Sequence, residues 1–280
     1  MIRKDKEIFE LLCRQGELSV QQLSQNLQVS PSSIRRYLRN LDDHPYILRT
    51  HGGAVLSQGV CYDSLPVSFP EVDKAEARAI AYLATQIIKP GDVVGLSGGR
   101  LCTELALNLR FREGITVVTN AINIACELVG LPGIKVMVCG GIIDYGSYEL
   151  TGQMISRALE GIYIQKYFVG TDGITIENGL TNRSEAEATA AREFVRHTGQ
   201  VIVLADHLKF VKSNLAQVVR AEDINTIITS SNTPPEILQP FSEIGTEILI
   251  APVDSQEEQK RKTKLPSPPQ TDLLQNIAGA

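Results

Sequence analysis

Three arginines within five residues are the side chains of this sequence best suited to binding an anion. Arg35, Arg36 and Arg39 occur in the segment VSPSSIRRYLRNL, residues 29–41, of a chain whose formal net charge is −5. A guanidinium group binds phosphate oxygens and can also fork onto a guanine edge. The alternatives are a helix face that is merely solvated and a face that meets a polyanion.

The charge is unevenly distributed along the chain. Residues 1–60 contain eight lysines and arginines against six acids, a net charge of +2, which leaves −7 for the other 220 residues. A cationic segment on an otherwise acidic protein indicates a part that faces nucleic acid. The asymmetry therefore favours the polyanion, although on its own it is weak support.

The elements that must position these arginines follow from the local apolar spacing. Residues 4–14 and the segment after ELSV each repeat apolar side chains at helical spacing. A third helix is predicted to begin at Ser30, whose hydroxyl caps it, with Pro31 in the first turn. Its buried stripe comprises Ile34, Leu38 and Leu41. Arg36 and Arg39 then lie opposite this stripe, with Arg35 and Ser32 at its margin.

A short hairpin is predicted after the third helix. The segment YILRTHGGAV has a β-like pattern with two glycines at its tip. Three helices followed by a small hairpin outline a winged helix-turn-helix, which presents its second motif helix to the major groove of DNA. In this context the solvated-face interpretation of the arginines becomes the less favoured one.

From residue 72 onward the pattern changes to apolar runs that alternate with helical stretches. Predicted strands are DVVGL, ITVVT, IKVMV, KYFVGTDGI, VIVLAD and NTIITS, and predicted helices are CTELALNLR, INIACELV and SEAEATAAREFVRH. This alternation predicts an α/β domain with a mostly parallel sheet. We expect a winged helix-turn-helix at 1–57, a linker at 58–71, the α/β domain at 72–252 and a disordered tail at 253–280.

The bulk composition argues against several classes of protein. There is no apolar run long enough to span a membrane and no signal peptide, so we expect a cytoplasmic protein. The five cysteines are scattered without a CxxC pair, and the four histidines lack metal-ligand spacing. We therefore expect reduced thiols, no metal and no cofactor.

A second candidate site comes from residues that follow the predicted strands. They are Ser97, Gly98 and Gly99, then Asn120, Gly140 and Gly141, Asp172 and Gly173, and finally Asp206 and Lys209. Glycines between a strand and a helix let backbone N–H groups approach an anion. Ligands of open α/β sheets bind beyond the carboxyl ends of the strands, so these loops are expected to converge on one crevice. Each loop taken singly is more often structural.

The front of the chain resembles the DNA-binding domain of DeoR-family transcriptional regulators. The run LSVQQLSQNLQVSPSSIRRYLRNL and the later LRTHGGAV carry this resemblance, and VSPSSIRR and HGGA are its most specific parts. It implies that operator DNA is contacted by the helix residues Ser32, Ser33, Arg35, Arg36 and Arg39 and by the wing residues His51, Gly52 and Gly53. Tyr37 departs from the aspartate usual in the family, and we expect it to pack beside the buried stripe.

The body is similar to the effector domain of the same family, which resembles ribose-5-phosphate isomerase. The segments VVGLSGGRLCTELA, ITVVTNAINIACEL, VCGG, LTGQMISRAL, YFVGTDGI, GLTNRSEAEA and VLADHLKF carry the resemblance. It implies a repressor of carbohydrate genes that a phosphorylated sugar releases from DNA, acting as a homo-oligomer. The implied effector residues are Ser97, Gly98, Gly99, Arg100, Cys102, Thr103, Asn120, Gly141, Asp172, Glu185 and Lys209.

Arg100 and Leu101 stand where the family usually has two threonines whose hydroxyls bind phosphate. Leu101 cannot form a hydrogen bond, whereas Arg100 can supply a charged fork instead. One alternative is therefore a DNA-binding regulator whose effector site has degenerated. A second is a sugar-phosphate isomerase, because Asp172, Glu185 and Lys209 are residue types that move protons. The attached DNA-binding module argues against that enzyme, and no catalytic residue is predicted.

Overall fold

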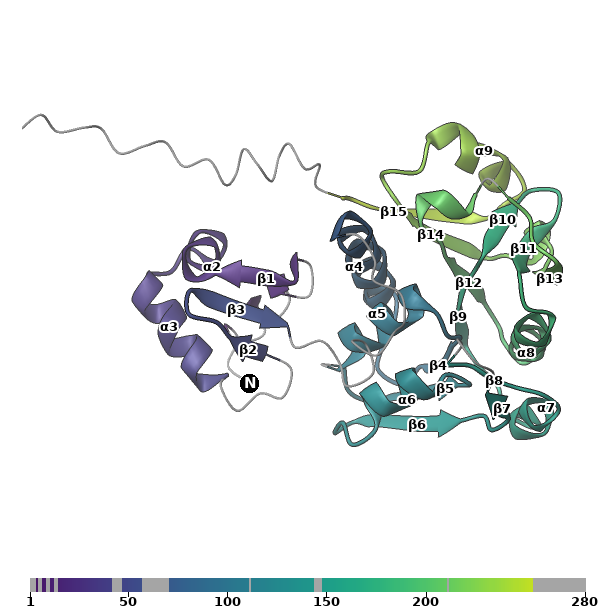
Figure 1. Cartoon of the computed structure of the whole chain (residues 1–280), viewed down its shortest axis with the longest axis horizontal. Helices are drawn as coiled ribbons and strands as arrows, with labels where there is room; N and C mark the ends of the chain where they lie inside the picture. The colour runs from purple at the N-terminus through teal and green to yellow at the C-terminus, as the bar shows by residue number, and fades with distance from the viewer. Residues whose placement is uncertain are drawn as a thin grey trace, which may run out of the picture.

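The computed structural model describes residues 4, 7–8, 11–12, 15–41, 47–56, 71–110, 112–143, 148–210 and 212–253. Its elements form a small N-terminal unit, here called the head, and a larger α/β unit, here called the body (Figure 1). The predicted linker, apart from Glu71, and the predicted tail, apart from Val253, lie outside the described residues.

The head contains two complete helices and a three-stranded antiparallel sheet. Its elements are β1 (Glu17–Ser19), α2 (Val20–Leu27), α3 (Pro31–Asn40), β2 (Ile47–Arg49) and β3 (Gly53–Leu56). The predicted hairpin is confirmed as β2 and β3, and β1, which was not predicted, pairs with the other edge of β3. The predicted cap of α3 is also confirmed, because the Ser30 hydroxyl accepts the backbone N–H of Ser33 at 3.3 Å.

The predicted apolar stripe forms the core of the head. Ile34, Leu38 and Leu41 are buried together with side chains from the first helical segment, including Ile8 and Leu12. Tyr37 is partly buried against the same core, as predicted. This packing leaves the opposite face of α3, with its arginines, in solvent.

The body is built around a seven-stranded parallel sheet, which confirms the predicted α/β fold. The strand order is β15-β14-β12-β9-β4-β5-β6. The strands are β4 (Val93–Leu96), β5 (Ile115–Thr119), β6 (Ile134–Val138), β9 (Lys166–Gly170), β12 (Val201–Leu204), β14 (Thr226–Ser230) and β15 (Glu247–Ala251). The predicted strand KYFVGTDGI is divided, because its second half, β10 (Gly173–Thr175), leaves the sheet and pairs with β11 (Gly179–Asn182).

Helices cover both faces of the sheet (Figure 1). One face carries α4 (Glu71–Gln86), α5 (Arg100–Leu109) and α6 (Ile122–Leu128), and the other carries α7 (Met154–Leu159), α8 (Glu185–Arg196) and α9 (Pro235–Glu243). Successive side chains of a strand point to opposite faces of the sheet, so Phe168 packs with the first group of helices while Tyr167 and Val169 pack with the second. The remaining elements are β7 (Ile142–Ile143), β8 (Leu150–Thr151), β13 (Ala216–Val219), η1 (His207–Lys209) and η2 (Ala221–Asp223).

Helix α4 is the element of the body that contacts the head. Tyr82 of α4 is partly buried against the apolar core of the head. The guanidinium of Arg78 lies so close to Gly16 that a Cβ there would meet its Nη1 at 2.3 Å. The head therefore rests on the helix that also covers β14 and β15 of the sheet.

Gly53 provides a test of the head fold. A Cβ at Gly53 would lie 2.0 Å from the carbonyl oxygen of Leu18, whereas a Cβ at Gly52 would meet nothing within 4 Å. We expect Gly53→Ala to destabilise the head by about 1–3 kcal/mol, because β1 must move away from β3. Amide hydrogen exchange in β1 and β3 should be faster in this variant and unchanged in Gly52→Ala. Equal protection in the two variants would contradict the described pairing.

Candidate functional sites: a DNA-facing helix and a charged cavity

The first site is the exposed face of α3. Arg35, Arg36 and Arg39 are all exposed, and the Arg36 guanidinium lies 5.5 Å from the centre of the Tyr37 ring. Such cation–π contacts orient a guanidinium without neutralising its charge. The first turn adds Ser32, whose hydroxyl is 2.9 Å from that of Ser30, and Ser33, whose hydroxyl accepts from Ser30 at 3.0 Å.

The predicted wing residues divide into two kinds. His51 and Gly52 are exposed at the tip between β2 and β3, whereas Gly53 is buried beneath the tip. The Gly52 carbonyl accepts the backbone N–H of Val20 at 2.8 Å, which joins the wing to the start of α2. Gly53 thus packs inside the wing, whereas His51 and Gly52 are exposed at its tip.

The second site is a cavity of about 730 Å³ in the body. It lies at the carboxyl ends of β4, β9 and β12, where the chain order of the sheet reverses between β4 and β9. Strands that follow β4 extend the sheet in one direction and strands that follow β9 extend it in the other, so their outgoing loops separate and leave a crevice. The predicted convergence of the strand-end loops is borne out for these three strands.

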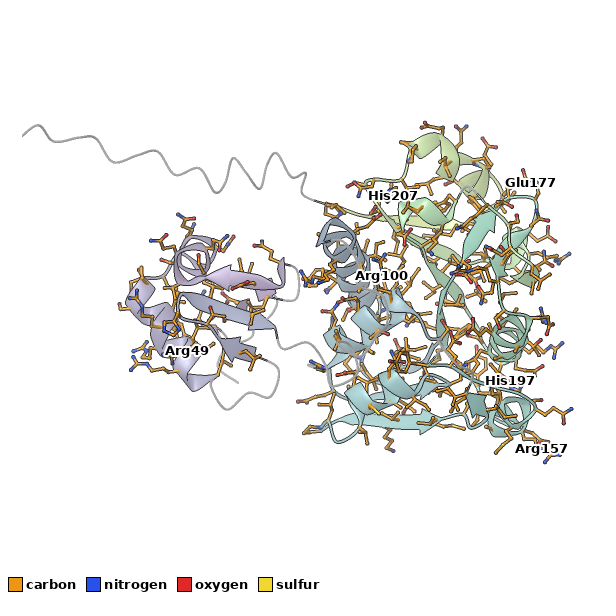
Figure 2. The ribbon with its side chains drawn as sticks, viewed as in Figure 1. Arg49, Arg100, Arg157, Glu177, His197 and His207 are labelled. Carbon is orange, nitrogen blue, oxygen red and sulfur yellow. The ribbon has the colours of Figure 1, made fainter. Side chains whose placement is uncertain are left out.

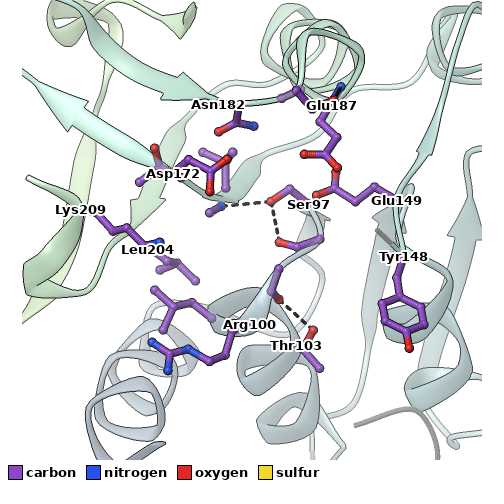
Figure 3. Close-up of a pocket in the computed structure, with 18 of the residues that line it drawn as sticks. Ser97, Arg100, Thr103, Tyr148, Glu149, Asp172, Asn182, Glu187, Leu204 and Lys209 are labelled. Atoms are coloured by element: carbon purple, nitrogen blue, oxygen red, sulfur yellow. Dashed lines mark hydrogen bonds between the residues drawn. The ribbon is translucent and has the colours of Figure 1, made fainter. Parts of the chain in front are cut away.

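A glycine turn opens one wall of the cavity. Ser97, Gly98 and Gly99 join β4 to α5, and Gly99 has a φ of 87°, a value that favours glycine. No side chain caps α5, and its first residues line the cavity, which places the positive end of the helix dipole at this wall. Ser97 Oγ accepts the Gly170 N–H at 3.0 Å, which ties this turn to the end of β9 (Figure 3).

Two ion pairs and a lysine give the cavity its cationic groups. Arg100 Nη2 lies 3.1 Å from Asp206 Oδ2, and Arg183 Nη2 lies 2.9 Å from Asp172 Oδ1. Burial alone would raise the pKa of Asp172, but hydrogen bonds from Arg183 outweigh it and hold that pKa below its ordinary value. Lys209 lines the same wall and adds to the lowering.

The lining also includes two acids, Glu149 and Glu187, and Glu149 contacts the glycine turn itself. Glu149 and Glu187 point their carboxyl groups toward one another (Figure 3). Burial and then repulsion from Glu187 raise the pKa of Glu149 to about 7. The cavity therefore brings together a helix N-terminus, cationic side chains and two mutually repelling carboxyl groups, one of which lies against the glycine turn.

Most of the sequence-predicted effector residues meet at this cavity. Its lining includes Ser97, Gly98, Gly99, Arg100, Thr103, Asp172 and Lys209. Asn120 reaches it indirectly, because its Nδ2 donates to Glu149 Oε2 at 3.1 Å.

Besides Asn120, three predicted effector residues do not line the cavity. Cys102 is fully buried behind the turn, with its Sγ against the Phe168 carbonyl. Gly141 packs closely on the backbone of Thr151, where a Cβ would lie 2.3 Å from its carbonyl oxygen. The Glu185 side chain is 64% exposed and pairs with Arg192, whereas Glu187, two residues further along the chain, lines the cavity.

The sequence prediction also missed several residues of the lining. Arg183 and Glu187 flank the N-cap Ser184 of α8, so recognition of that cap would have located them at the start of a helix. Glu149 had no such signal. It reaches the cavity through an isolated bridge with Ala121, a long-range pairing that no local pattern predicts.

A contact outside the cavity joins it to α4. His207, which is labelled in Figure 2, is next to Asp206. Its Nδ1 lies 2.9 Å from Glu76 Oε2, and its backbone N–H donates to Glu76 Oε1 at 3.1 Å. Glu76 is almost fully buried and also accepts the Ser230 hydroxyl. Burial raises its pKa, but hydrogen bonds from Ser230 and His207 outweigh that effect and keep the pKa below its ordinary value.

A winged helix-turn-helix joined to an α/β domain with a charged cavity defines a transcriptional regulator with a sensor domain. The model of the DeoR-like helix-turn-helix domain matches residues 4–59, and that of the DeoR C terminal sensor domain matches residues 73–231. The chain therefore belongs to the DeoR family of transcriptional regulators.

Relatives of known name support this assignment. Transcriptional repressor AccR of Agrobacterium fabrum is 31% identical, over 82% of this chain and 90% of its own. The lactose phosphotransferase system repressor of Lactococcus lactis is 26% identical, over 87% and 96%. A solved D-ribose-5-phosphate isomerase in complex with phospho-erythronic acid is 18% identical over 51% and 55%, with a TM-score of 0.37, a likeness too weak to argue from.

Within the described part of the chain, no helix combines the length and the apolar character that crossing a membrane requires.

The arginines of α3 can be separated by their effect on DNA binding. We expect Arg35→Ala, Arg36→Ala and Arg39→Ala each to weaken binding of the full-length protein to its operator. A phosphate-contacting arginine should lower affinity for all sequences and reduce the salt slope by about 1, whereas a base-contacting arginine should cost about 1–3 kcal/mol at one position. Arg157→Ala, an exposed arginine of the body, is the matched control. Unchanged operator affinity in all three head variants would exclude α3 as the helix that contacts operator DNA.

Proposed function

We propose that this protein represses carbohydrate-metabolism genes and leaves its operator when a phosphorylated sugar fills the cavity of the body. The observation that carries the proposal is the combination, in one chain, of an arginine-lined recognition helix and a cavity whose lining includes a helix N-terminus and three cationic side chains. A repressor of this kind works where the DNA is, so we infer a cytoplasmic protein.

The proposed DNA contact rests on charge and shape. The apolar stripe of α3 is buried, and its exposed face bears three arginines. Phosphate contacts of this kind supply most of the affinity for duplex DNA, and the major groove admits one helix. We infer a homo-oligomer, because two heads at half-site spacing bind far more tightly than one.

The proposed ligand follows from the polarity of the cavity. The uncapped N-terminus of α5 favours a phosphate, and Arg100, Arg183 and Lys209 can contribute charge-assisted hydrogen bonds. The Asn123 amide is oriented by its bond to Thr103 Oγ1, which itself donates to the Gly99 carbonyl. Carboxyl and amide oxygens elsewhere in the lining can accept sugar hydroxyls. Leu101 lines the cavity with an apolar side chain that packs in the core and cannot form a hydrogen bond, so Arg100 alone takes over the role of the usual threonine pair.

We also infer that the cavity binds its ligand without converting it. Asp172 would be the base for a proton transfer, but its carboxylate accepts both the backbone N–H of Arg183 at 3.0 Å and the Arg183 side chain at 2.9 Å. Its lowered pKa makes it a weak base. Arg183 and Asp172 are better suited to fixing a ligand than to moving its protons.

Helix α4 offers a physical connection between the cavity and the head. The loop after β12 supplies Asp206 and Lys209 to the cavity and His207 to Glu76 of α4. Two and six residues further along the helix, Arg78 and Tyr82 contact the head. A ligand that draws Asp206 or Lys209 toward itself would bias this connection, by no more than its differential affinity for the two arrangements.

Titration of the operator complex tests the proposal. Genome-wide mapping of bound DNA first identifies the operator, and the neighbouring genes suggest which sugar phosphates to add. We expect one sugar phosphate to weaken operator binding by about 5–150-fold, the usual range of allosteric coupling, and its unphosphorylated sugar to have no effect. Lys209→Ala should lose most of the response, and Lys212→Ala, which changes an exposed lysine outside the cavity lining, should keep it.

Two outcomes would contradict the proposal. In one, no phosphorylated sugar changes operator affinity of the wild-type protein. In the other, Lys209→Ala and Lys212→Ala respond equally, which would move the ligand away from this cavity.

A further inference from the structure

Glu149 places its carboxyl group on the same glycine turn that the proposed phosphate site uses. The Gly98 backbone N–H donates to this carboxyl group, and Asn120 Nδ2 donates to its Oε2 at 3.1 Å. A Cβ at Gly98 would lie 2.3 Å from Glu149 Cγ, so the two groups are in direct contact. The turn therefore already holds an anionic group that belongs to the protein.

The backbone around Glu149 is fixed, so only its side chain can give way. Glu149 forms a bridge with Ala121, and the bonds on either side run from Ile122 N to Tyr148 O at 2.9 Å and from Leu150 N to Asn120 O at 2.7 Å. These bonds tie the segment to the loop after β5. A ligand on the turn must displace the Glu149 side chain or meet it in its neutral form.

The surroundings of Glu149 destabilise its ionised form. Glu187 of α8 and Asp172 after β9 face it, and both raise its pKa, which burial has already increased; the result is about 7. Cys102 and Tyr167, the other titratable groups nearby, have pKa values raised by burial, so both are neutral near pH 7. Two of the three cationic side chains of the cavity are paired with other acids, Arg100 with Asp206 and Arg183 with Asp172.

We propose that Glu149 is the residue that sets the affinity of this cavity for anionic ligands, because its carboxylate competes for the glycine turn at the N-terminus of α5. This inference rests on the proposed function, in which a phosphate binds at that turn. It assigns to Glu149 a role in specificity: an anionic ligand binds well only when this carboxyl group is neutral or displaced.

The expected size of the effect follows from the fraction of protein with a neutral Glu149. With a pKa of about 7, Glu149 is mostly ionised at about pH 8 and mostly neutral at about pH 6. Apparent affinity scales with the binding-competent fraction, so it should rise about tenfold between those two values as the pH falls. Removing the charge should give about the same gain at the higher pH.

Inorganic sulfate is the probe, since its own charge is constant over this pH range. Sulfate is titrated into full-length wild-type protein and Glu149→Gln, and binding is followed by the NMR signals of the Gly98 and Gly99 N–H groups. Glu149→Ala is a second variant, which keeps the comparison available if the glutamine disturbs the loop. Glu185→Gln is the matched control, because it removes one negative charge outside the cavity.

We expect Glu149→Gln to bind sulfate about tenfold more tightly than wild type at about pH 8 and to lose the pH dependence. Glu185→Gln should match wild type. Equal or weaker binding by both Glu149 variants, or no binding at the turn by any variant, would overturn the proposal. If sulfate binds as expected while sugar phosphates leave operator affinity unchanged, the role of Glu149 stands and the proposed function fails.

Discussion

The parallel pairing of β4 with β9 is the constraint on which both the cavity and its electrostatics depend. Val94, Gly95 and Leu96 lie beside Lys166, Tyr167 and Phe168 at the centre of the sheet. A Cβ at Gly95 would approach the Tyr167 ring to 2.8 Å, so this close packing favours glycine. Because the chain order reverses at this pair, the loops that follow the two strands separate, and the N-terminus of α5 opens into the gap. The Ser97 hydroxyl joins the two sides by accepting from Gly170.

Within that gap the protein balances opposite charges against each other before any ligand arrives. Arg100 and Arg183 each hold an acid, and the glycine turn holds Glu149. A buried charge is stable only when it is paired or can become neutral. Glu149 faces two further acids, so it is the member of this set whose charge is most easily lost. Ligand affinity in such a site depends on the ion pairs and hydrogen bonds that the protein must break as well as on those that it forms with the ligand.

Local patterns in the sequence predicted most of the elements, and long-range contacts account for what they missed. The stripe Ile34, Leu38 and Leu41 and the cap Ser30 located α3 and its arginines, because helix periodicity and capping are properties of adjacent residues. Glycines and acids directly after the predicted strands indicated the cavity, because loops at the carboxyl ends of parallel strands lie at one edge of the sheet. Glu149 could not be predicted, since it depends on the bridge with Ala121. Glu187, and not the predicted Glu185, lines the cavity, and local pattern does not separate them because both are acids in the first turn of α8.

We propose that filling the cavity changes DNA affinity through α4, and the Glu76–His207 contact allows a direct test. The measurement is the operator affinity of Glu76→Gln with and without the sugar phosphate that releases the wild-type protein, together with the affinity of the variant for that sugar phosphate. We expect the variant to bind the sugar phosphate about as well as wild type but to lose most of the change in operator affinity. An undiminished change in operator affinity would contradict it.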